Sequence, residues 1–170
     1  FHGDRIDFSV EWKSLLRGSL VAECELFNPK LNLLRAESAG ASQLGQGVAW
    51  GGEPENSFPF RFNTVRVYDG TITFRAPAIR AEDALGATDV DGEITNMTNV
   101  VPAGRAAFAS FKATAAVLGD GSAAIAGTAN PWAKTPTFDV NLTVKNVKLP
   151  KVNPWLREYI KADAEQGDFE

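Results

Sequence analysis

The sequence predicts a mainly β protein with one short helix near its C-terminal end. Three observations predict this fold class. Apolar and polar residues alternate with a period of two over most of the chain. Asn-Pro, Asp-Gly and Gly-rich stretches separate the alternating runs. Only the segment after Asn153 carries apolar residues at helical spacing. The 170 residues are 44% hydrophobic and 22% charged, as in an ordinary globular domain.

In the N-terminal part, the alternation of apolar and polar residues predicts two strands and a short third one. In the first strand, the apolar face consists of alternating residues, namely Ile6, Phe8, Val10 and Trp12. The run LVAECELF at 20–27 continues the same period until Asn28, and a brief strand is expected at 31–34. Cys24 falls in phase with the apolar residues, so it is interpreted as a small core hydrophobe. Segment 35–57 is rich in Ala, Ser and Gly and predicts a flexible insertion that carries Trp50.

The middle of the chain predicts a hairpin around Asp69-Gly70, since this dipeptide suits a two-residue type I′ turn. The turn would pair Val67 with Ile72 and Val65 with Phe74, which gives the hairpin one apolar face. Phe60 and Phe62 are out of phase with Val65. A bulge near Asn63-Thr64 is therefore expected.

The second half predicts four more strand segments. One begins near Val90, and two surround a second Asp-Gly turn at 120–121. The last has the clearest alternation in the chain, with four apolar residues on one side: Phe138, Val140, Leu142 and Val144. A further strand is expected to begin after Gly167.

A helix is predicted over residues 153–162. Asn153 is a good N-cap and Pro154 a good first helical residue. The apolar side of the helix consists of Trp155, Leu156, Tyr159 and Ile160. A helix of two to three turns is marginal by itself, so these four residues are expected to dock it on one end of the sheet.

About nine strands with one apolar face each need a cover, because burying apolar surface is worth about 25 cal/mol per Å². The sheet can fold into a sandwich, close into a barrel, or stay a curved gutter whose interior meets something other than this chain. Residues 105–128 are mostly small, and small side chains leave room for a helix or a ligand. The small residues do not distinguish a helix from a ligand, and from the residues alone a closed sandwich core is favoured.

Composition argues against several function classes. The net charge of -4, without a basic stripe, argues against nucleic-acid binding. His2 is the single histidine and lies near a terminus, so no catalytic residues, metal site or cofactor are predicted. The acidic run TDVDGE at 88–93 resembles part of a calcium loop, but a turn leading into a strand is favoured. No stretch approaches the ~20 apolar residues of a membrane span.

Three parts of the chain carry a family resemblance. The runs VYDGTITF and AGTANPWAKTPTFDVNLTVKNVKLPKVNPWLREYIKADAEQGDF, together with DFSVEWKSLLRGSLVAECELFNPKL, resemble the AsmA-like proteins of Gram-negative envelopes, in a branch known as a domain of unknown function. The resemblance implies a curved, twisted antiparallel sheet that forms a groove or half-barrel with an apolar lining. It also implies a role in moving phospholipid toward the outer membrane or in envelope integrity. The motifs are structural, and the resemblance supplies no catalytic residue.

The resulting expectation is a non-enzymatic lipid-binding module in the periplasm. The sequence starts at Phe1, and residues 1–170 are expected to be one segment of a longer chain, anchored in the inner membrane by a part outside this sequence. Acyl chains would contact an apolar lining made of Ile6, Phe8, Val10, Val65, Val67, Ile72, Phe74, Phe111, Phe138, Val140, Leu142 and Val144. The expected partners are phospholipid or another acyl-chain lipid, neighbouring β units, and a second copy through sheet edges. The alternative is an envelope scaffold that associates by strand addition.

Overall fold

The computed structural model describes residues 1–35, 58–100, 107–133 and 135–169. Most of the expected insertion with Trp50 therefore lies outside the described residues. The elements, in chain order, are β1 Arg5–Val10, α1 Trp12–Leu15, β2 Leu20–Phe27, β3 Lys30–Leu34, β4 Phe60–Arg75, the 3₁₀ turn Ala81–Asp83, β5 Leu85–Thr98, β6 Ala109–Val117, β7 Gly121–Asn130, β8 Thr137–Lys145, β9 Val147–Lys148, the 3₁₀ turn Leu149–Val152, α2 Asn153–Tyr159 and β10 Asp168–Phe169.

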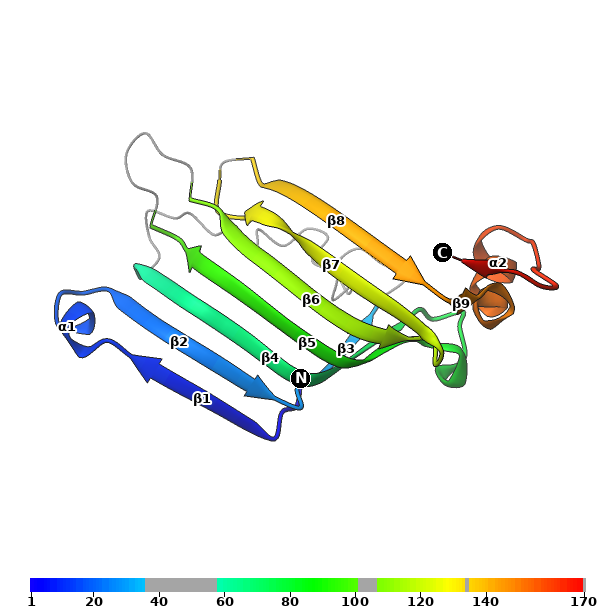
Figure 1. Cartoon of the computed structure of the whole chain (residues 1–170), viewed down its shortest axis with the longest axis horizontal. Helices are drawn as coiled ribbons and strands as arrows, with labels where there is room; N and C mark the ends of the chain where they lie inside the picture. Colours follow the sequence, from blue (N-terminus) through cyan, green and yellow to red (C-terminus); the bar gives the residue numbers. More distant parts are fainter. Residues whose placement is uncertain (36–57, 101–106, 134, 170) are drawn as a thin grey trace.

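The structure is mainly β, and its main part is one open, curved sheet of eight strands (Figure 1). The strand order is β1-β2-β4-β5-β6-β7-β8, with β3 also paired to β4. The expected curved, open sheet is confirmed, but it is mixed rather than antiparallel throughout, because β2 and β3 both run parallel to β4. The remaining pairs in this sheet are antiparallel. β9 and β10 form a separate two-stranded sheet.

The parallel pairs arise because β2 and β3 follow one another along the same edge of β4. Phe27 pairs with Tyr68 and Lys30 with Thr71, so the register stays the same across the break at Asn28. Hydrogen bonds span the break: the Asn28 N–H donates to the Tyr68 carbonyl at 2.9 Å, and the Thr71 N–H donates to the Pro29 carbonyl at 2.8 Å. β2 and β3 thus form one interrupted line beside a long partner.

The predicted hairpin at Asp69-Gly70 is wrong, because β4 passes through this dipeptide as a single 16-residue strand. A type I′ turn needs a positive φ at both central residues. Here Asp69 has a φ of 55°, whereas Gly70 is not in the positive range. The dipeptide instead forms an irregularity in the ladder with β5. A Cβ on Gly70 would lie 3.3 Å from the Val90 Cβ, so a side chain here would crowd the neighbouring strand.

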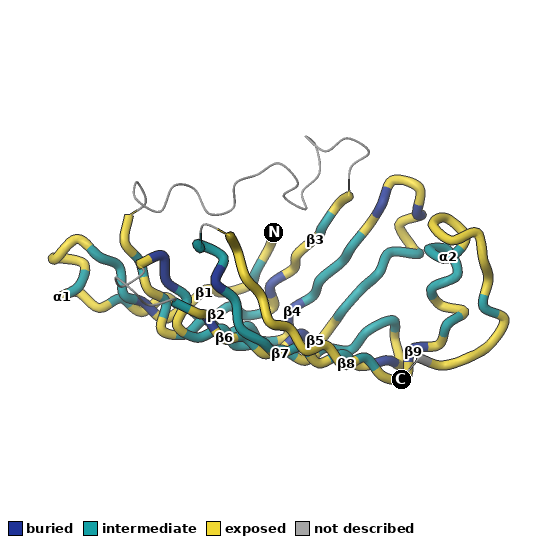
Figure 2. Tube along the Cα trace, turned by 90° about the horizontal axis from the view of Figure 1, so that it is seen from above, coloured by how far each residue is buried: buried dark blue, intermediate teal, exposed yellow. Residues whose placement is uncertain are grey.

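Positive backbone angles line up across three neighbouring strands at this point. Asn28 has a φ of 49°, Asp69 of 55° and Asp89 of 51°. Asn and Asp tolerate this region better than other non-glycine residues. These neighbouring irregularities mark the place where β4 and β5 bend, which we call the crease. Figure 2 shows the ends of β4 and β5 turned up toward the side on which α2 lies.

The other local predictions mostly hold. The register shifts on β4 between Phe62 and Thr64, which confirms the expected bulge. β6 and β7 form the expected hairpin, although the positive φ values fall on Leu118 and Gly119. β5 begins at Leu85, ahead of the expected start. Trp12 lies in α1 rather than in the first strand.

Few of the described apolar side chains are buried, unlike in the core of a closed sandwich or barrel. The buried apolar residues are Ala22, Ala76, Ile79, Val90, Ala109 and Val147, and no large side chain among the described residues is fully buried. A sandwich or closed barrel would bury large side chains between its layers. The sheet is therefore a single open layer, and most of one face has no second layer from the described part of the chain.

Candidate functional site

The strand register places one continuous apolar row across the whole sheet. Residues directly opposite each other in a ladder have side chains on the same face. Phe8 pairs with Cys24, which pairs with Val65, and the row continues through strands β5 to β8. The complete row is Phe8, Cys24, Val65, Ile94, Phe111, Gly127 and Val140. Seven strands thus contribute no charged or hydrogen-bonding side chain other than the Cys24 thiol to this row.

A second row runs beside the first one. It consists of Ile6, Leu26, Val67, Gly92, Ala113, Ile125 and Leu142. Val10, Phe138 and Val144 lie on the same face by alternation, so ten of the twelve predicted lining residues share it. We call this side of the sheet, which carries both apolar rows, the apolar face. The sheet bends toward this side, because Val117 and Val144 of the apolar face line one cavity together with Phe74 from the far end of β4.

The sequence did not single out several members of the apolar face. These are Leu26, Phe62, Ile94, Met97 and Ile125. The glutamates that alternate with Cys24 and Leu26 in β2 were a usable signal for its apolar side. For Ile94 and Ile125 the deciding information is the long-range pairing, because small and polar neighbours weaken the local pattern.

Large side chains on the apolar face remain open to solvent. Phe138 is 64% exposed, Leu142 61%, Ile6 54%, Val140 51% and Phe8 50%. These residues lie on β1 and β8, the two strands at the ends of the sheet order. Exposed apolar patches of this kind, here one at each end of the apolar rows, mark binding sites for a ligand, a protein or a membrane.

The remaining two predicted lining residues, Ile72 and Phe74, lie beyond the crease in β4. There they line a cavity of about 460 Å³. Its other walls are Leu85, Gly86, Ala87, Val117, Leu118, Val144, Val147, Leu149 and Val152. Val117 and Val144 belong to the apolar face, so this cavity is its continuation at the C-terminal end. Ligand pockets commonly fall in the range of about 300–1,000 Å³.

Helix α2 docks at this end of the sheet. The Trp155 ring stacks on Phe74 with centroids 5.3 Å apart, and its indole N–H donates to the Asp83 carbonyl at 2.8 Å. Tyr159 stacks on the outer side of Trp155 at 5.8 Å. Of the other two predicted docking residues, Leu156 is half-buried, whereas Ile160 is 65% exposed at the end of the helix.

Two polar contacts hold the segment around α2. Asn153 is the first residue of α2 rather than its N-cap, and its side-chain amide pairs with both backbone groups of Ala164 at 2.8 and 3.0 Å. Lys151 donates to the Leu118 carbonyl at 2.8 Å and to Asp120 at 3.0 Å. The hydrogen bond and charge of Lys151 lower the pKa of the Asp120 carboxyl. The Lys151 contacts fasten the α2 segment to the β6–β7 turn, and the Asn153–Ala164 pair ties the start of α2 to the chain that follows it.

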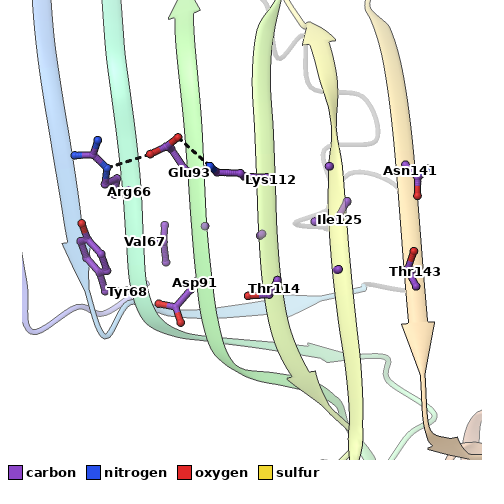
Figure 3. Close-up of a pocket in the computed structure, with 14 residues that line it drawn as sticks. Arg66, Val67, Tyr68, Asp91, Glu93, Lys112, Thr114, Ile125, Asn141 and Thr143 are labelled. Carbon is purple, nitrogen blue, oxygen red and sulfur yellow. Dashed lines mark hydrogen bonds and ion pairs between the residues drawn. The ribbon is translucent and has the colours of Figure 1, made fainter.

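The opposite face of the sheet is polar. Figure 3 shows Glu93 between Arg66 and Lys112, with ion pairs of 3.1 and 3.5 Å. Arg66 also pairs with Glu25 at 3.5 Å, and the Tyr68 hydroxyl donates to Glu25 at 3.1 Å. The hydrogen bond from Arg66, together with the nearby Lys112 charge, lowers the pKa of Glu93. The side chains form a charge-alternating row across four strands.

A shallow hollow of about 660 Å³ lies beside this charged row. Its floor includes Ala124 and Ala126, and Asn141 and Thr143 stand at its side (Figure 3). Within the described ranges no group of three or more His, Cys, Asp or Glu side chains is placed to hold a metal ion. Glu93 of the acidic run TDVDGE is engaged in the ion pairs, inside β5. The helices among the described residues are too short or too polar to cross a membrane.

A scan against protein-family models and searches of curated proteins and of solved structures find no match for this chain. The resemblance to AsmA-like proteins therefore stays a prediction that rests on the quoted residues. The geometry of the sheet carries the functional argument.

Proposed function

We propose that this chain is a non-enzymatic lipid-binding module that holds acyl chains against its apolar face. The observation that carries the proposal is the uninterrupted apolar row across seven strands, which ends in large, solvent-exposed side chains on β1 and β8. The charged row on the opposite face gives the sheet one side that suits water and one that does not.

The chemistry of the apolar face fits hydrocarbon better than a polar ligand. Its two rows offer backbone-paired strands and side chains without charge, so they supply no group that fixes a ligand at one position. Each sheltered methylene contributes about 0.8 kcal/mol wherever it lies along such a wall. An acyl chain can therefore slide along the face, while its headgroup stays in water at the rim. The cavity beyond the crease, lined in part by Leu149 and Val152 of the 3₁₀ turn before α2, lies at one end of this path.

The place of the protein in the cell enters the proposal through the family resemblance. On that basis the module works in the periplasm of a Gram-negative bacterium and takes phospholipid as its ligand. Transfer of lipid between the two membranes would need neighbouring β units that prolong the apolar face. Binding requires only the residues described above.

The binding proposal is tested with a fluorescent fatty acid such as cis-parinaric acid and two variants from opposite ends of the sheet. Phe8→Asp and Phe138→Asp each place a charge among exposed apolar residues, so both should weaken binding about tenfold or more, because an ionised carboxylate has to be desolvated beside the chain. Thr137→Asp is the matched control, since this exposed residue precedes Phe138 and points to the other face. Equal affinity of all four proteins would overturn the proposal.

A scaffold that associates by strand addition is the second candidate. The observation in its favour is that β1 and β8 each have a single strand partner among the described residues. Open edges of this kind are templates for pairing with another chain. A protein that self-associates but binds no acyl probe would favour the scaffold.

A further inference from the structure

Strand β8 offers an open edge that is unusually suited to pairing. Its nine residues, Thr137–Lys145, pair with β7 on one side, and no described strand lies on the other. Eight of the nine residues are exposed. Figure 1 shows β8 as the outermost strand, with α2 beyond its C-terminal end rather than alongside its open edge. Long, exposed edge strands recruit further strands unless they are protected.

The sequence of β8 is complementary to itself in one antiparallel register. When Leu142 lies opposite Leu142 of a second copy, Val140 meets Val144 and Asn141 meets Thr143. In the same register Asp139 meets Lys145, and symmetry produces this pair twice. No ion pair of Asp139 or Lys145 exists within the described part of the chain. Opposite charges directly across a strand pair stabilise it, and like charges destabilise it.

We propose that two copies of this chain associate through their β8 edges in this register. The arrangement is isologous, because the same strand of each copy forms both halves of the interface. The two-fold axis is perpendicular to the sheet and passes beside Leu142. A rotation about such an axis keeps both apolar faces on the same side. The dimer therefore joins the two curved sheets into one, with an apolar face of twice the width.

The edge strand at the other end of the sheet fits a second copy less well. β1 has six residues, and Arg5 already pairs with Asp7 within the strand at 3.3 Å. A β1–β8 contact between copies would be head-to-tail and would produce open chains of molecules rather than a closed dimer. The association inferred for β8 uses backbone and charges at the edge, so it and the lipid proposal can fail separately.

Cysteine crosslinking tests the register. Directly opposite residues in an antiparallel pair have Cα atoms about 4.5–5.5 Å apart, which suits a disulfide. In a Cys24→Ser background, Leu142→Cys should form a crosslinked dimer under mild oxidation. Phe138→Cys is the matched control: Phe138 is 64% exposed and Leu142 61%, but its symmetry mate would lie eight residues along the strand, about 27 Å away. Equal crosslinking of both variants would overturn the register.

A charge exchange tests the same register without a covalent bond. In sedimentation equilibrium, the unmodified chain should show a monomer–dimer equilibrium. Asp139→Lys should raise the dissociation constant about tenfold or more, because two attractive pairs become repulsive. The double variant Asp139→Lys/Lys145→Asp should return to within about threefold of the original value. A protein that stays monomeric at all concentrations, assembles beyond dimers, or shows no rescue would overturn the proposal. Unimpaired binding of the acyl probe by such a protein would leave the lipid proposal standing.

Discussion

Trp155 stacks on Phe74 with ring centroids 5.3 Å apart and donates its indole N–H to the Asp83 carbonyl at 2.8 Å. This pair connects α2 to the part of β4 beyond the crease. It covers one end of the apolar face and leaves the rest open. The helix is thus an end closure, and its effect on stability can be separated from ligand binding along the sheet.

Trp155→Ala should lower the free energy of unfolding by about 2 kcal/mol or more, because a large half-buried ring and its hydrogen bond are both removed. Trp155→Phe keeps a ring on Phe74 and loses the donor, so it should cost about 1 kcal/mol. Urea unfolding followed by circular dichroism measures both changes. A Trp155→Ala protein as stable as the original would mean that α2 does not dock.

The fastening of the α2 segment to the β6–β7 turn can be followed at Asp120. Lys151→Met removes the hydrogen bond and the charge that lower the pKa of this carboxyl, so its pKa should rise toward the ordinary value. Lys148→Met is the control: its ammonium lies 3.9 Å from Asp120, against 3.0 Å for Lys151, and should matter less. NMR titration of the Asp120 carboxyl distinguishes the two. A larger effect of Lys148→Met would contradict the contact geometry.

The charged row on the polar face predicts a dependence of stability on pH. The pKa of Glu93 is lowered in the folded protein, so the unfolded chain binds more protons in this range. The contribution of Glu93 is fully present above its ordinary pKa of 4.5 and is lost as the pH falls through the lowered value. The Glu93→Gln protein should therefore have a lower free energy of unfolding than the original at pH 7. This difference should shrink as the pH falls below the lowered pKa of Glu93.

Chemical denaturation at a series of pH values measures that gap. Glu23→Gln is the control, because Glu23 is an exposed glutamate on the same face and makes no ion pair with the described residues. It should cost little at any pH. A constant difference between Glu93→Gln and the original from pH 7 to pH 3 would show that the ion pairs with Arg66 and Lys112 do not stabilise the fold.

Gly127 provides a test of the packing on the apolar face. A Cβ at this position would lie 2.8 Å from Phe111 Cζ and would press on the Asp139 carbonyl oxygen. Gly127→Ala should therefore destabilise the protein by about 1–3 kcal/mol, as expected for overpacking. Ala126→Ser, at the exposed neighbour on the opposite face, should stay within about 0.5 kcal/mol. Thermal unfolding compares the two variants, and equal melting temperatures would contradict the close packing of the Phe111 ring against Gly127.

Local alternation was sufficient to predict β2 and β8, because each has a regular apolar side opposite charged or polar residues. It also predicted the bulge between Phe62 and Thr64. It could not predict the parallel pairing of β2 with β4, because that contact joins segments separated by more than thirty residues. The hairpin predicted at Asp69-Gly70 was wrong for a related reason. β4 pairs with β2 before this dipeptide and with β3 after it, so the strand continues through it instead of reversing.

The candidate site was likewise predicted where local alternation decides and missed where long-range pairing decides. Alternation identified most of the apolar face, including Phe8 at one end of the row and Val140 at the other. The contribution of Ile94 and Ile125 depends on register, which no local pattern contains. The cavity beyond the crease likewise depends on the bend at Asp69. The Trp155 indole contact with Asp83 joins residues far apart in the sequence and had no local signal.

Protection of Cys24 from alkylation tests the central claim most directly. Cys24 is the single cysteine of the chain and lies in the apolar row between Phe8 and Val65. Burial, with a smaller effect of Glu25, raises the pKa of its thiol, so the reaction with a water-soluble maleimide is best followed at mildly alkaline pH. Ser9→Cys in a Cys24→Ser background places a control thiol on the opposite face of β1.

The rates are measured on delipidated protein with and without a short-chain phosphatidylcholine below its critical micelle concentration. If acyl chains lie on the apolar face, saturating lipid should slow the alkylation of Cys24 about tenfold and leave the Ser9→Cys thiol unchanged. Equal rates at Cys24 with and without lipid, in a protein that remains folded, would contradict the account.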